Sequence, residues 1–226
     1  MQVKLISYTK LSEELLNDGV SNIQDLVAYC ARVSNPSNQN NSSTSDKLIK
    51  YLLKHKHFSP FEMANICLEI NTTRDIARQI LRHRSFTFQE FSQRYANPED
   101  LDSMFTTREA RLQHPTNRQS SIDVDERDNL DLKWRELQKE VIKLNKNVYE
   151  WALKNNIAKE QARAVLPEGL TMSRMYVNGT IRSWIHYIDV RSGNGTQKEH
   201  MKIAREVADV ICRIFPLSKD FVKEVD

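Results

Sequence analysis

The residues most able to do chemistry lie together between positions 82 and 95, in the segment RHRSFTFQEFSQRY. It combines cations and a serine with four aromatic residues, namely Arg82, His83, Arg84, Ser92 and Arg94 with Phe86, Phe88, Phe91 and Tyr95. Guanidinium groups bind phosphates through paired hydrogen bonds, and aromatic rings stack on planar ligands. The segment therefore suits a ligand that has both a phosphate and a planar ring.

Two other interpretations of this segment stay open. The helix dipole favours cations at a helix C-terminus, so the segment could be a solvated basic cap in which Arg78 and Arg82 share a face one turn apart. A surface for single-stranded nucleic acid also combines cations with stacking aromatic residues. The formal net charge of +3 is low for that class, and we expect no nucleic-acid partner.

Phosphate binding in this chain cannot depend on the common glycine loops. The sequence has five glycines, and none of them forms GxGxxG or GxxxxGK[ST]. Arginine side chains and helix N-termini are the alternative phosphate ligands.

The chain as a whole has the composition of a soluble globular protein. With 226 residues, 39% hydrophobic and 28% charged, it is expected to form a single domain over residues 1–226. The first nine residues lack the layout of a signal peptide, and no apolar run approaches the ~20 residues of a membrane span. Cys30, Cys67 and Cys212 are far apart, which argues against a zinc site or a disulfide framework. We therefore expect a cytoplasmic protein with no metal and no membrane partner.

Periodicity along the chain predicts a mixed α+β fold. Alternating apolar residues predict strands over Gln2–Tyr8, Phe61–Ile70 and Leu170–Asn178. Helical periodicity predicts helices over Ile23–Val33, Asp46–His55, Arg74–Arg82 with Thr73 as its cap, Asp128–Lys154, Ile157–Leu166, Thr180–Val190 and Gln197–Phe215. The polar stretches Asn35–Ser45 and Asn97–Asp125 are expected to be loops, the second lying over the surface or the site.

The helix predicted over Asp128–Lys154 has the clearest pattern. Its apolar residues recur in steps of four and three, as in a heptad seam, at Leu130, Trp134, Leu137, Val141, Leu144, Val148 and Trp151. Such a seam packs either on the rest of its own domain, which is the plainer interpretation, or on another subunit.

The segment from Arg82 resembles the signature of the flavin-dependent thymidylate synthases, the thymidylate synthase complementing family. That signature is RHR, seven further residues and a serine, here Arg82-His83-Arg84 and Ser92. Further segments are similar to the family's, in the same order over positions 1 to 215: His57–Glu62, Ala77–Gln79, Glu90–Tyr95, Ala162–Pro167 and Arg182–Arg191. A different flavoprotein or nucleotide-binding enzyme with the same fold is the alternative, because fold does not fix function.

The resemblance implies a particular fold and reaction. The fold would have a central antiparallel sheet, flanking helices and a long helical segment, and would bind flavin without a Rossmann fold. The enzyme would convert dUMP to dTMP, with methylene-tetrahydrofolate as one-carbon donor and FADH2, reduced by NADPH, as hydride source. It would be a homotetramer whose active sites lie at subunit interfaces.

The resemblance also assigns roles to residues. FAD would be held by Ser59, Arg82, His83 and Arg84, with Thr180, Arg182 and His186 from another subunit. The dUMP pocket would comprise Gln79, Arg82, Glu90, Ser92, Gln93, Arg94 and Arg163. Arg191 would lie against the uracil, and His57 would flank the flavin where the folate stacks. Without the resemblance, a lone histidine such as His57 is more simply a core residue.

Two positions depart from the family pattern. Thr180 stands where the family often has asparagine, and Gly195 stands where it commonly has a histidine. Two glycines, at 193 and 195, are expected to make that turn more flexible.

Activation of the uracil is expected to come from Arg191. The three cysteines lie in stretches that predict core positions, and none is in the segment from 82 to 95, so none is expected to act as a nucleophile. A guanidinium held against the ring would stabilise its anionic form.

Overall fold

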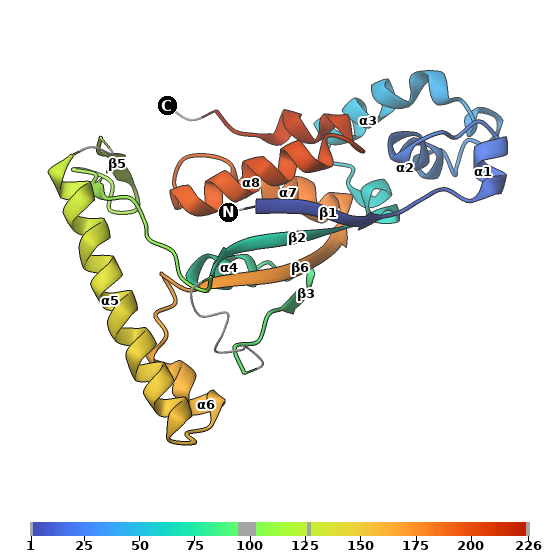
Figure 1. The fold of residues 1–226 in the computed structure, drawn as a ribbon. Coiled ribbons are helices and arrows are strands. Elements are labelled where there is room, and N and C mark those ends of the chain that lie inside the picture. Colours follow the sequence, from blue (N-terminus) through green and yellow to red (C-terminus); the bar gives the residue numbers. More distant parts are fainter. Residues whose placement is uncertain (1, 95–102, 126–127, 225–226) are drawn as a thin grey trace.

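A four-stranded antiparallel sheet forms the centre of the computed structural model, which describes residues 2–94, 103–125 and 128–224 (Figure 1). In spatial order the strands are β1 (Gln2–Tyr8), β2 (Asn65–Thr73), β6 (Met172–Thr180) and β3 (Thr87–Glu90). The sheet, the helices around it and one long helix confirm the predicted α+β class. The strand predicted from Phe61 begins four residues later, because Pro60 starts a 3-10 helix over Ser59–Met63.

One face of the sheet is buried and the other is largely polar. On β2, Ile66, Leu68 and Ile70 have no exposed surface, and Leu68 pairs in register with Val177 of β6. On β6, the buried residues Met175 and Val177 flank Tyr176, which is exposed on the other face of the sheet. This two-residue alternation is what a sheet with a single covered face requires.

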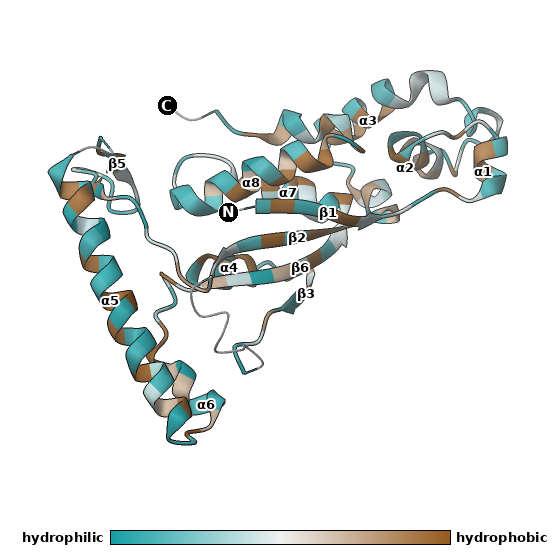
Figure 2. Cartoon of the chain, in the orientation of Figure 1, coloured by the Kyte–Doolittle hydropathy of each residue, from teal (hydrophilic) through white to brown (hydrophobic). Residues whose placement is uncertain are grey.

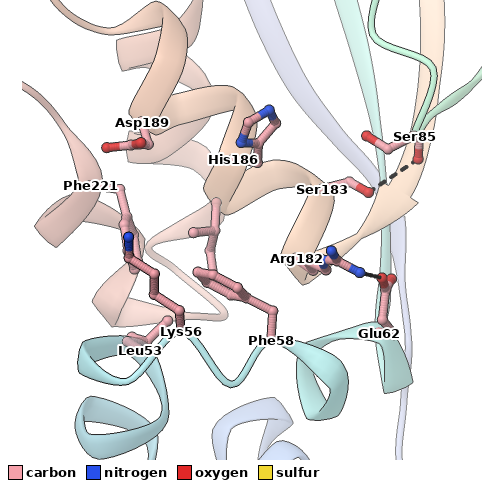
Figure 3. A pocket seen from close by; sticks show the side chains of 11 residues that line it. Leu53, Lys56, Phe58, Glu62, Ser85, Arg182, Ser183, His186, Asp189 and Phe221 are labelled. Carbon is pink, nitrogen blue, oxygen red and sulfur yellow. Dashed lines mark hydrogen bonds and ion pairs between the residues drawn. The ribbon is translucent and has the colours of Figure 1, made fainter.

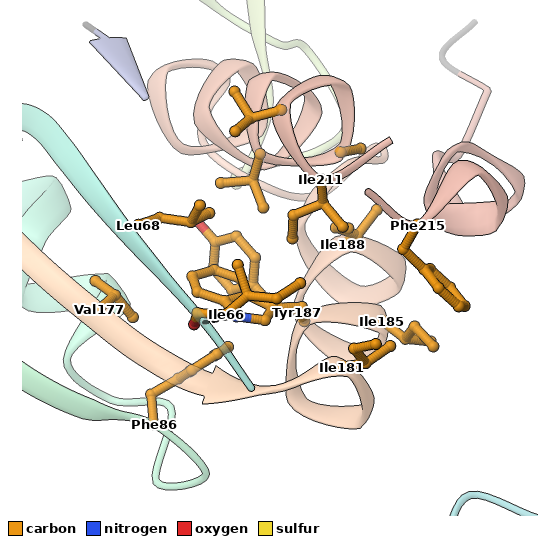
Figure 4. Close-up of a cluster of buried hydrophobic side chains, with 14 of the residues drawn as sticks. Ile66, Leu68, Phe86, Val177, Ile181, Ile185, Tyr187, Ile188, Ile211 and Phe215 are labelled. Carbon is orange, nitrogen blue, oxygen red and sulfur yellow. Dashed lines mark hydrogen bonds between the residues drawn. The ribbon is translucent and has the colours of Figure 1, made fainter. Parts of the chain in front are cut away.

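Helices cover the apolar face of the sheet (Figure 1). They are α4 (Arg74–Ile80), α7 (Ile181–Arg191) and α8 (Lys198–Ile211). Helices α2 (Ile23–Ala31) and α3 (Ser45–Lys54) join the same core beyond the end of the sheet, and the short α1 (Glu13–Asn17) follows β1. Figure 4 shows side chains of α7 and α8 meeting those of β2 and β6. The buried indole of Trp184 donates to the Ile66 carbonyl at 3.0 Å, so this large ring is buried without an unpaired N–H. The loop predicted over Asn35–Ser45 includes two short 3-10 helices, Pro36–Asn38 and Ser42–Thr44.

Phe86 belongs to this core, which corrects its interpretation as a ring for stacking on a ligand. It is 6% exposed and lies between Trp184 and Tyr187. Gly179 on β6 makes room for it, because a Cβ there would overlap the Phe86 ring. Phe88 packs on the core as well, whereas Phe91 is exposed and Tyr95 lies outside the described residues.

An arm built from residues 103–166 extends from the sheet (Figure 1). It comprises a hairpin of β4 (Arg111–Gln113) and β5 (Ser121–Asp123), the helix α5 (Asn129–Lys154), the short helix α6 (Lys159–Ala162) and a 3-10 turn over Arg163–Val165. The hairpin lies in the stretch predicted to be a loop, of which 97–102 lie outside the described residues. The helix predicted over Ile157–Leu166 is correspondingly shorter. A small separate core, Met104, Tyr149, Ala152, Ala162 and Leu166, holds the base of the arm together.

The arm is tied to α4 by Arg108. Its guanidinium donates to the Thr73 hydroxyl and to Asp75, each at 2.6 Å. Thr73 occupies the N-cap position of α4, as predicted, but its hydroxyl makes no capping hydrogen bond and accepts from Arg108 instead.

The apolar seam of α5 faces away from its own chain, so the plainer interpretation of that pattern is wrong. All seven seam residues are exposed, Trp134 by 45% and Trp151 by 61%. Figure 2 shows apolar positions recurring along α5. In its first half, the face of α5 that packs on its own chain is polar: Asp131 accepts from the Ala110 N–H at 2.5 Å, and Gln138 accepts from the Arg108 N–H at 2.8 Å. No described helix, α5 included, is long and apolar enough to cross a membrane.

Candidate active site

The three residues Arg82–Arg84 lie in a turn between α4 and β3. Because α4 ends at Ile80, the prediction that Arg78 and Arg82 share a helical face is wrong. Arg78 instead pairs with Glu168 at 2.5 Å. The side chains of Arg82 and Arg84 are exposed, and no carboxylate among the described residues pairs with either. Two guanidinium groups are thus available for an anion.

His83 points inward from the same turn and meets Arg191. The Arg191 Nε donates to His83 Nε2 at 3.0 Å, across 108 positions of sequence. Burial, together with the positive charges of Arg191, His186 and Arg82, lowers the pKa of His83 to about 4. The imidazole is therefore neutral near pH 7, which leaves Nε2 able to accept from the guanidinium.

A pocket of about 480 Å³ opens beside α7 (Figure 3). Arg182 and His186 line it from α7, Ser85 lines it from the turn after Arg84, and Glu62 lines it from the 3-10 helix that begins at Ser59. Its remaining wall is mostly apolar, formed by Leu53, Phe58, Ile185 and Phe221 with Lys56 and Asp189. Of the residues predicted to hold the cofactor, Arg182 and His186 line this cavity, which has both polar and apolar walls.

Glu62 belongs to the site, although no role was predicted for it; it ends the segment His57–Glu62 that resembles the family. Its two carboxylate oxygens accept from the Thr180 hydroxyl and from Arg182, each at 2.7 Å. The hydrogen bond from Thr180, followed by that from Arg182, holds the pKa of Glu62 below its ordinary value. The side chain of Thr180 also caps α7 by accepting from the Ser183 N–H. Glu62 therefore holds the start of α7 against the segment that contains Ser59.

The end of β3 and the segment after it contain four predicted nucleotide ligands that lie close together in sequence. Glu90 accepts from the Ser173 hydroxyl at 2.8 Å and lies 3.6 Å from Arg74. Gln93 is 5% exposed, and among the described residues its side-chain Nε2 has no hydrogen-bond partner. Ser92 is half-buried and Arg94 is exposed. A buried amide donor without a partner suits an absent ligand that has acceptor oxygens.

The remaining predicted residues are spread over other elements. Gln79, on α4, is half-buried and bonded to Gln197 and His200. Arg163 begins the 3-10 turn of the arm and makes no ion pair among the described residues. His57 is exposed, beside His55 and Tyr51 with ring centroids 6.1 and 6.3 Å away, so the reading of it as a core histidine does not hold.

The cysteines are away from these residues. Cys30 lies on α2, Cys67 on β2, and Cys212 follows the end of α8; all three are free thiols and half-buried, less enclosed than predicted. Burial raises the pKa of Cys30 and of Cys67, which keeps these thiols protonated and weakly nucleophilic. Across the described ranges, no group of three His, Cys, Asp or Glu side chains could hold a metal ion.

Gly195 lies in the turn between α7 and α8 with a φ of +86°, a conformation that favours glycine. No atom outside its neighbours lies within 4 Å of where its Cβ would be, so conformation and not crowding favours glycine here. This turn leads into Gln197 and Glu199, which reach Gln79 through hydrogen bonds.

The chain is similar in sequence to a family of known proteins. The family described as thymidylate synthase complementing protein matches residues 14–217. A probable flavin-dependent thymidylate synthase of Paramecium bursaria Chlorella virus 1 is 45% identical over 216 residues, which cover 96% of each chain. A flavin-dependent thymidylate synthase of Synechocystis sp. is 44% identical over 218 residues, again covering 96% of each.

A solved structure shares the fold. It is a UMP/dUMP methylase, PolB, from Streptomyces cacaoi, bound with 5-Br dUMP. The TM-score is 0.80 at 22% identity, with 97% of this chain and 93% of the other covered. At that identity the likeness supports the architecture alone.

Proposed function

The chain belongs to the thymidylate synthase complementing protein family and is a flavin-dependent thymidylate synthase, which forms dTMP from dUMP, and from this premise we propose how its residues divide the work. The observation on which the proposal depends is the 3.0 Å contact between Arg191 and His83. Through this contact Arg191, which we propose binds the uracil, lies beside His83, the central residue of the Arg82–Arg84 turn.

We propose that FAD is held by Ser59, Arg82, His83 and Arg84, with Thr180, Arg182 and His186 from another subunit. The donor set fits the group: two exposed arginines, which no carboxylate in the described part of the chain pairs with, suit a diphosphate, and the pocket beside α7 has apolar walls for a ring. Glu62 would orient Arg182 for this role. Bound in reduced form, FAD supplies the hydride for the reaction.

The dUMP pocket is proposed to comprise Gln79, Arg82, Glu90, Ser92, Gln93, Arg94 and Arg163. Exposed Arg94 and half-buried Arg163 suit the phosphate, and the unpaired amide N–H groups of buried Gln93 suit a carbonyl or hydroxyl oxygen. His57 is exposed and beside Tyr51, as a residue that flanks a stacking folate would be.

Arg191 is proposed to activate the uracil without an enzyme nucleophile. One N–H of its guanidinium is donated to neutral His83, which fixes the plane of the group. The four remaining N–H groups can bond the uracil carbonyl and ring nitrogen and stabilise negative charge there. Methylene-tetrahydrofolate is then the one-carbon donor, and NADPH the source of reducing equivalents.

The protein is proposed to be a homotetramer with sites built at subunit interfaces. The exposed seam of α5 supports this assembly, because seven large apolar residues on one helix face are unusual on a monomer. Arg163 lies on the arm that carries this helix, so assembly could bring it to a pocket of another subunit.

The test is whether the purified protein contains FAD and forms dTMP. Denatured protein should release FAD in a one-to-one ratio with the chain. Supplying dUMP, methylene-tetrahydrofolate and NADPH should yield dTMP. A colourless protein that binds oligonucleotides instead would contradict the proposal.

A further inference from the structure

His200 lies near the start of α8 with its side chain wholly buried, and both of its ring nitrogens have partners. Nδ1 is 3.1 Å from Gln79 Oε1, and Nε2 is 3.1 Å from the Tyr187 hydroxyl. Burial, with the positive charge of Arg191, lowers the pKa of His200 to about 3, so the ring is neutral near pH 7. A neutral imidazole has one donor and one acceptor, so the direction of these two hydrogen bonds is not arbitrary.

The direction is set at the far end of the same chain of hydrogen bonds. Burial by itself would raise the pKa of the Glu199 carboxyl. The hydrogen bond and the charge of Arg111 outweigh this effect and hold the pKa of Glu199 below its ordinary value. The Glu199 carboxylate therefore only accepts, and it accepts from Gln197 Nε2 at 2.9 Å. Gln197 consequently turns its carbonyl to Gln79, whose Nε2 donates at 2.8 Å.

The orientation of Gln79 fixes the tautomer of His200 in turn. With its Nε2 toward Gln197, Gln79 presents its carbonyl oxygen to His200, so His200 Nδ1 has the hydrogen and donates. His200 Nε2 then accepts from the Tyr187 hydroxyl, whose pKa burial raises. Reversing the Gln79 amide would set two acceptors against each other at Gln197 and, with His200 in this tautomer, two donors against each other at His200.

We propose that His200 is a positioning residue: its donation to the Gln79 carbonyl stabilises the orientation that Glu199 and Gln197 set, and the second N–H of the Gln79 amide is thereby presented to the nucleotide. This inference rests on the proposed place of Gln79 in the dUMP pocket. Among the described residues that second N–H has no partner, and Gln79 is half-buried, so the N–H can meet a ligand. The ligand atom at this point is therefore an acceptor oxygen, since a donor would face a donor.

Two isosteric substitutions separate this role from a merely structural one. In His200→Asn the side-chain N–H falls where Nδ1 lies, so the donor to Gln79 is kept. In His200→Gln the amide reaches the Nε2 position, so the Tyr187 contact is kept and the donor to Gln79 is lost. Both remove the ring from the same buried site, so a purely structural role would predict similar losses in the two variants.

The measurement is the dUMP dissociation constant of the FAD-loaded protein, by calorimetry, with flavin content and melting temperature recorded for each variant. We expect His200→Gln to weaken dUMP binding on the order of tenfold, the equivalent of one hydrogen bond, and His200→Asn to stay within about threefold of wild type. FAD content should not change. Equal weakening in both variants, or none in either, would overturn the inference.

Glu199→Gln tests the other end of the chain if the histidine variants do not fold. An amide there lets Gln197 and Gln79 adopt either orientation, so dUMP binding should weaken several-fold while FAD stays bound. Unchanged dUMP binding would overturn the inference. A wild-type protein that contains FAD but binds no dUMP would overturn the proposed function itself, and this inference with it.

Discussion

Replacing Arg191 should slow dTMP formation far more than it disturbs the flavin. A guanidinium about 4 Å from a unit negative charge contributes about 4 kcal/mol at an effective dielectric constant of about 20. Arg191 is half-buried, so part of that is lost to water, and loss of one preorganised stabiliser typically costs roughly a hundredfold in rate. We therefore expect Arg191→Ala to form dTMP on the order of a hundred times more slowly than wild type.

Arg191→Lys distinguishes charge from geometry. The Nε of Arg191 is engaged with His83 at 3.0 Å, and the outer nitrogens are what remain for the uracil. Lysine has a single ammonium group and cannot bond His83 and a planar ligand edge with the same fixed geometry. We expect it to recover less than about a tenth of the wild-type rate, since a lost planar fork costs more than one hydrogen bond.

The assay follows both half-reactions in the same preparation, NADPH oxidation by absorbance and dTMP by chromatography. NADPH oxidation should survive in Arg191→Ala better than dTMP formation, because we propose that FAD is held mainly by the Arg82–Arg84 turn. Arg213→Ala, which removes an exposed arginine just beyond α8, is the matched control and should change neither. Near wild-type dTMP formation by Arg191→Ala would refute the assignment of uracil activation to this residue.

Three further outcomes are expected. Arg82→Ala and Arg84→Ala should each weaken FAD binding by roughly tenfold in calorimetric titration, as loss of a charge-assisted hydrogen bond does, and unchanged affinity in both would count against the cofactor site. Trp151→Glu, which charges the α5 seam, should reduce the assembly seen by light scattering, whereas Lys139→Glu should leave it intact; a fully active wild-type monomer at micromolar concentration would exclude the interface. The pKa of His200 falls from 6.5 to about 3 on folding, so the unfolded chain binds more protons than the folded chain between those pH values. The free energy of unfolding should therefore fall as pH drops below 6.5, and His200 should account for a loss of about 2 kcal/mol at pH 5. His200→Asn should flatten that dependence in thermal unfolding measured at pH 7 and pH 5.

Local pattern was enough to predict the elements that bury a periodic face. The strand Gln2–Tyr8 matches its prediction, and α5 begins at Asn129, one residue after the predicted start, with Asp128 as its cap. β3, β4 and β5 were missed because they are three or four residues long and their burial does not alternate strongly. The sequence could not show whether the α5 seam packs on its own chain or on another subunit, since the heptad spacing is the same in both cases.

The site was predictable in part for a related physical reason. Motif spacing identified Arg82–Arg84, but not that Phe86 fills the core against Gly179, which depends on a strand 93 positions away in the chain. The contact of His83 with Arg191 spans 108 positions, and that of Gln79 with His200 spans 121. No local signal marks such pairs. Glu62 could have been predicted, because it lies in the family-like segment His57–Glu62, and an acidic residue there suits an ion pair with one of the predicted cationic ligands.

The most direct test of the account is dTMP formation by a variant with Cys30, Cys67 and Cys212 all replaced by serine, measured with its flavin removed and again after FAD is restored. Melting temperature and flavin content show first that the variant is folded and loaded. The account predicts that the flavin-free protein makes no dTMP, and that FAD restores a rate close to that of wild type. A folded, FAD-loaded variant with no turnover, or dTMP formed equally well without flavin, would contradict it.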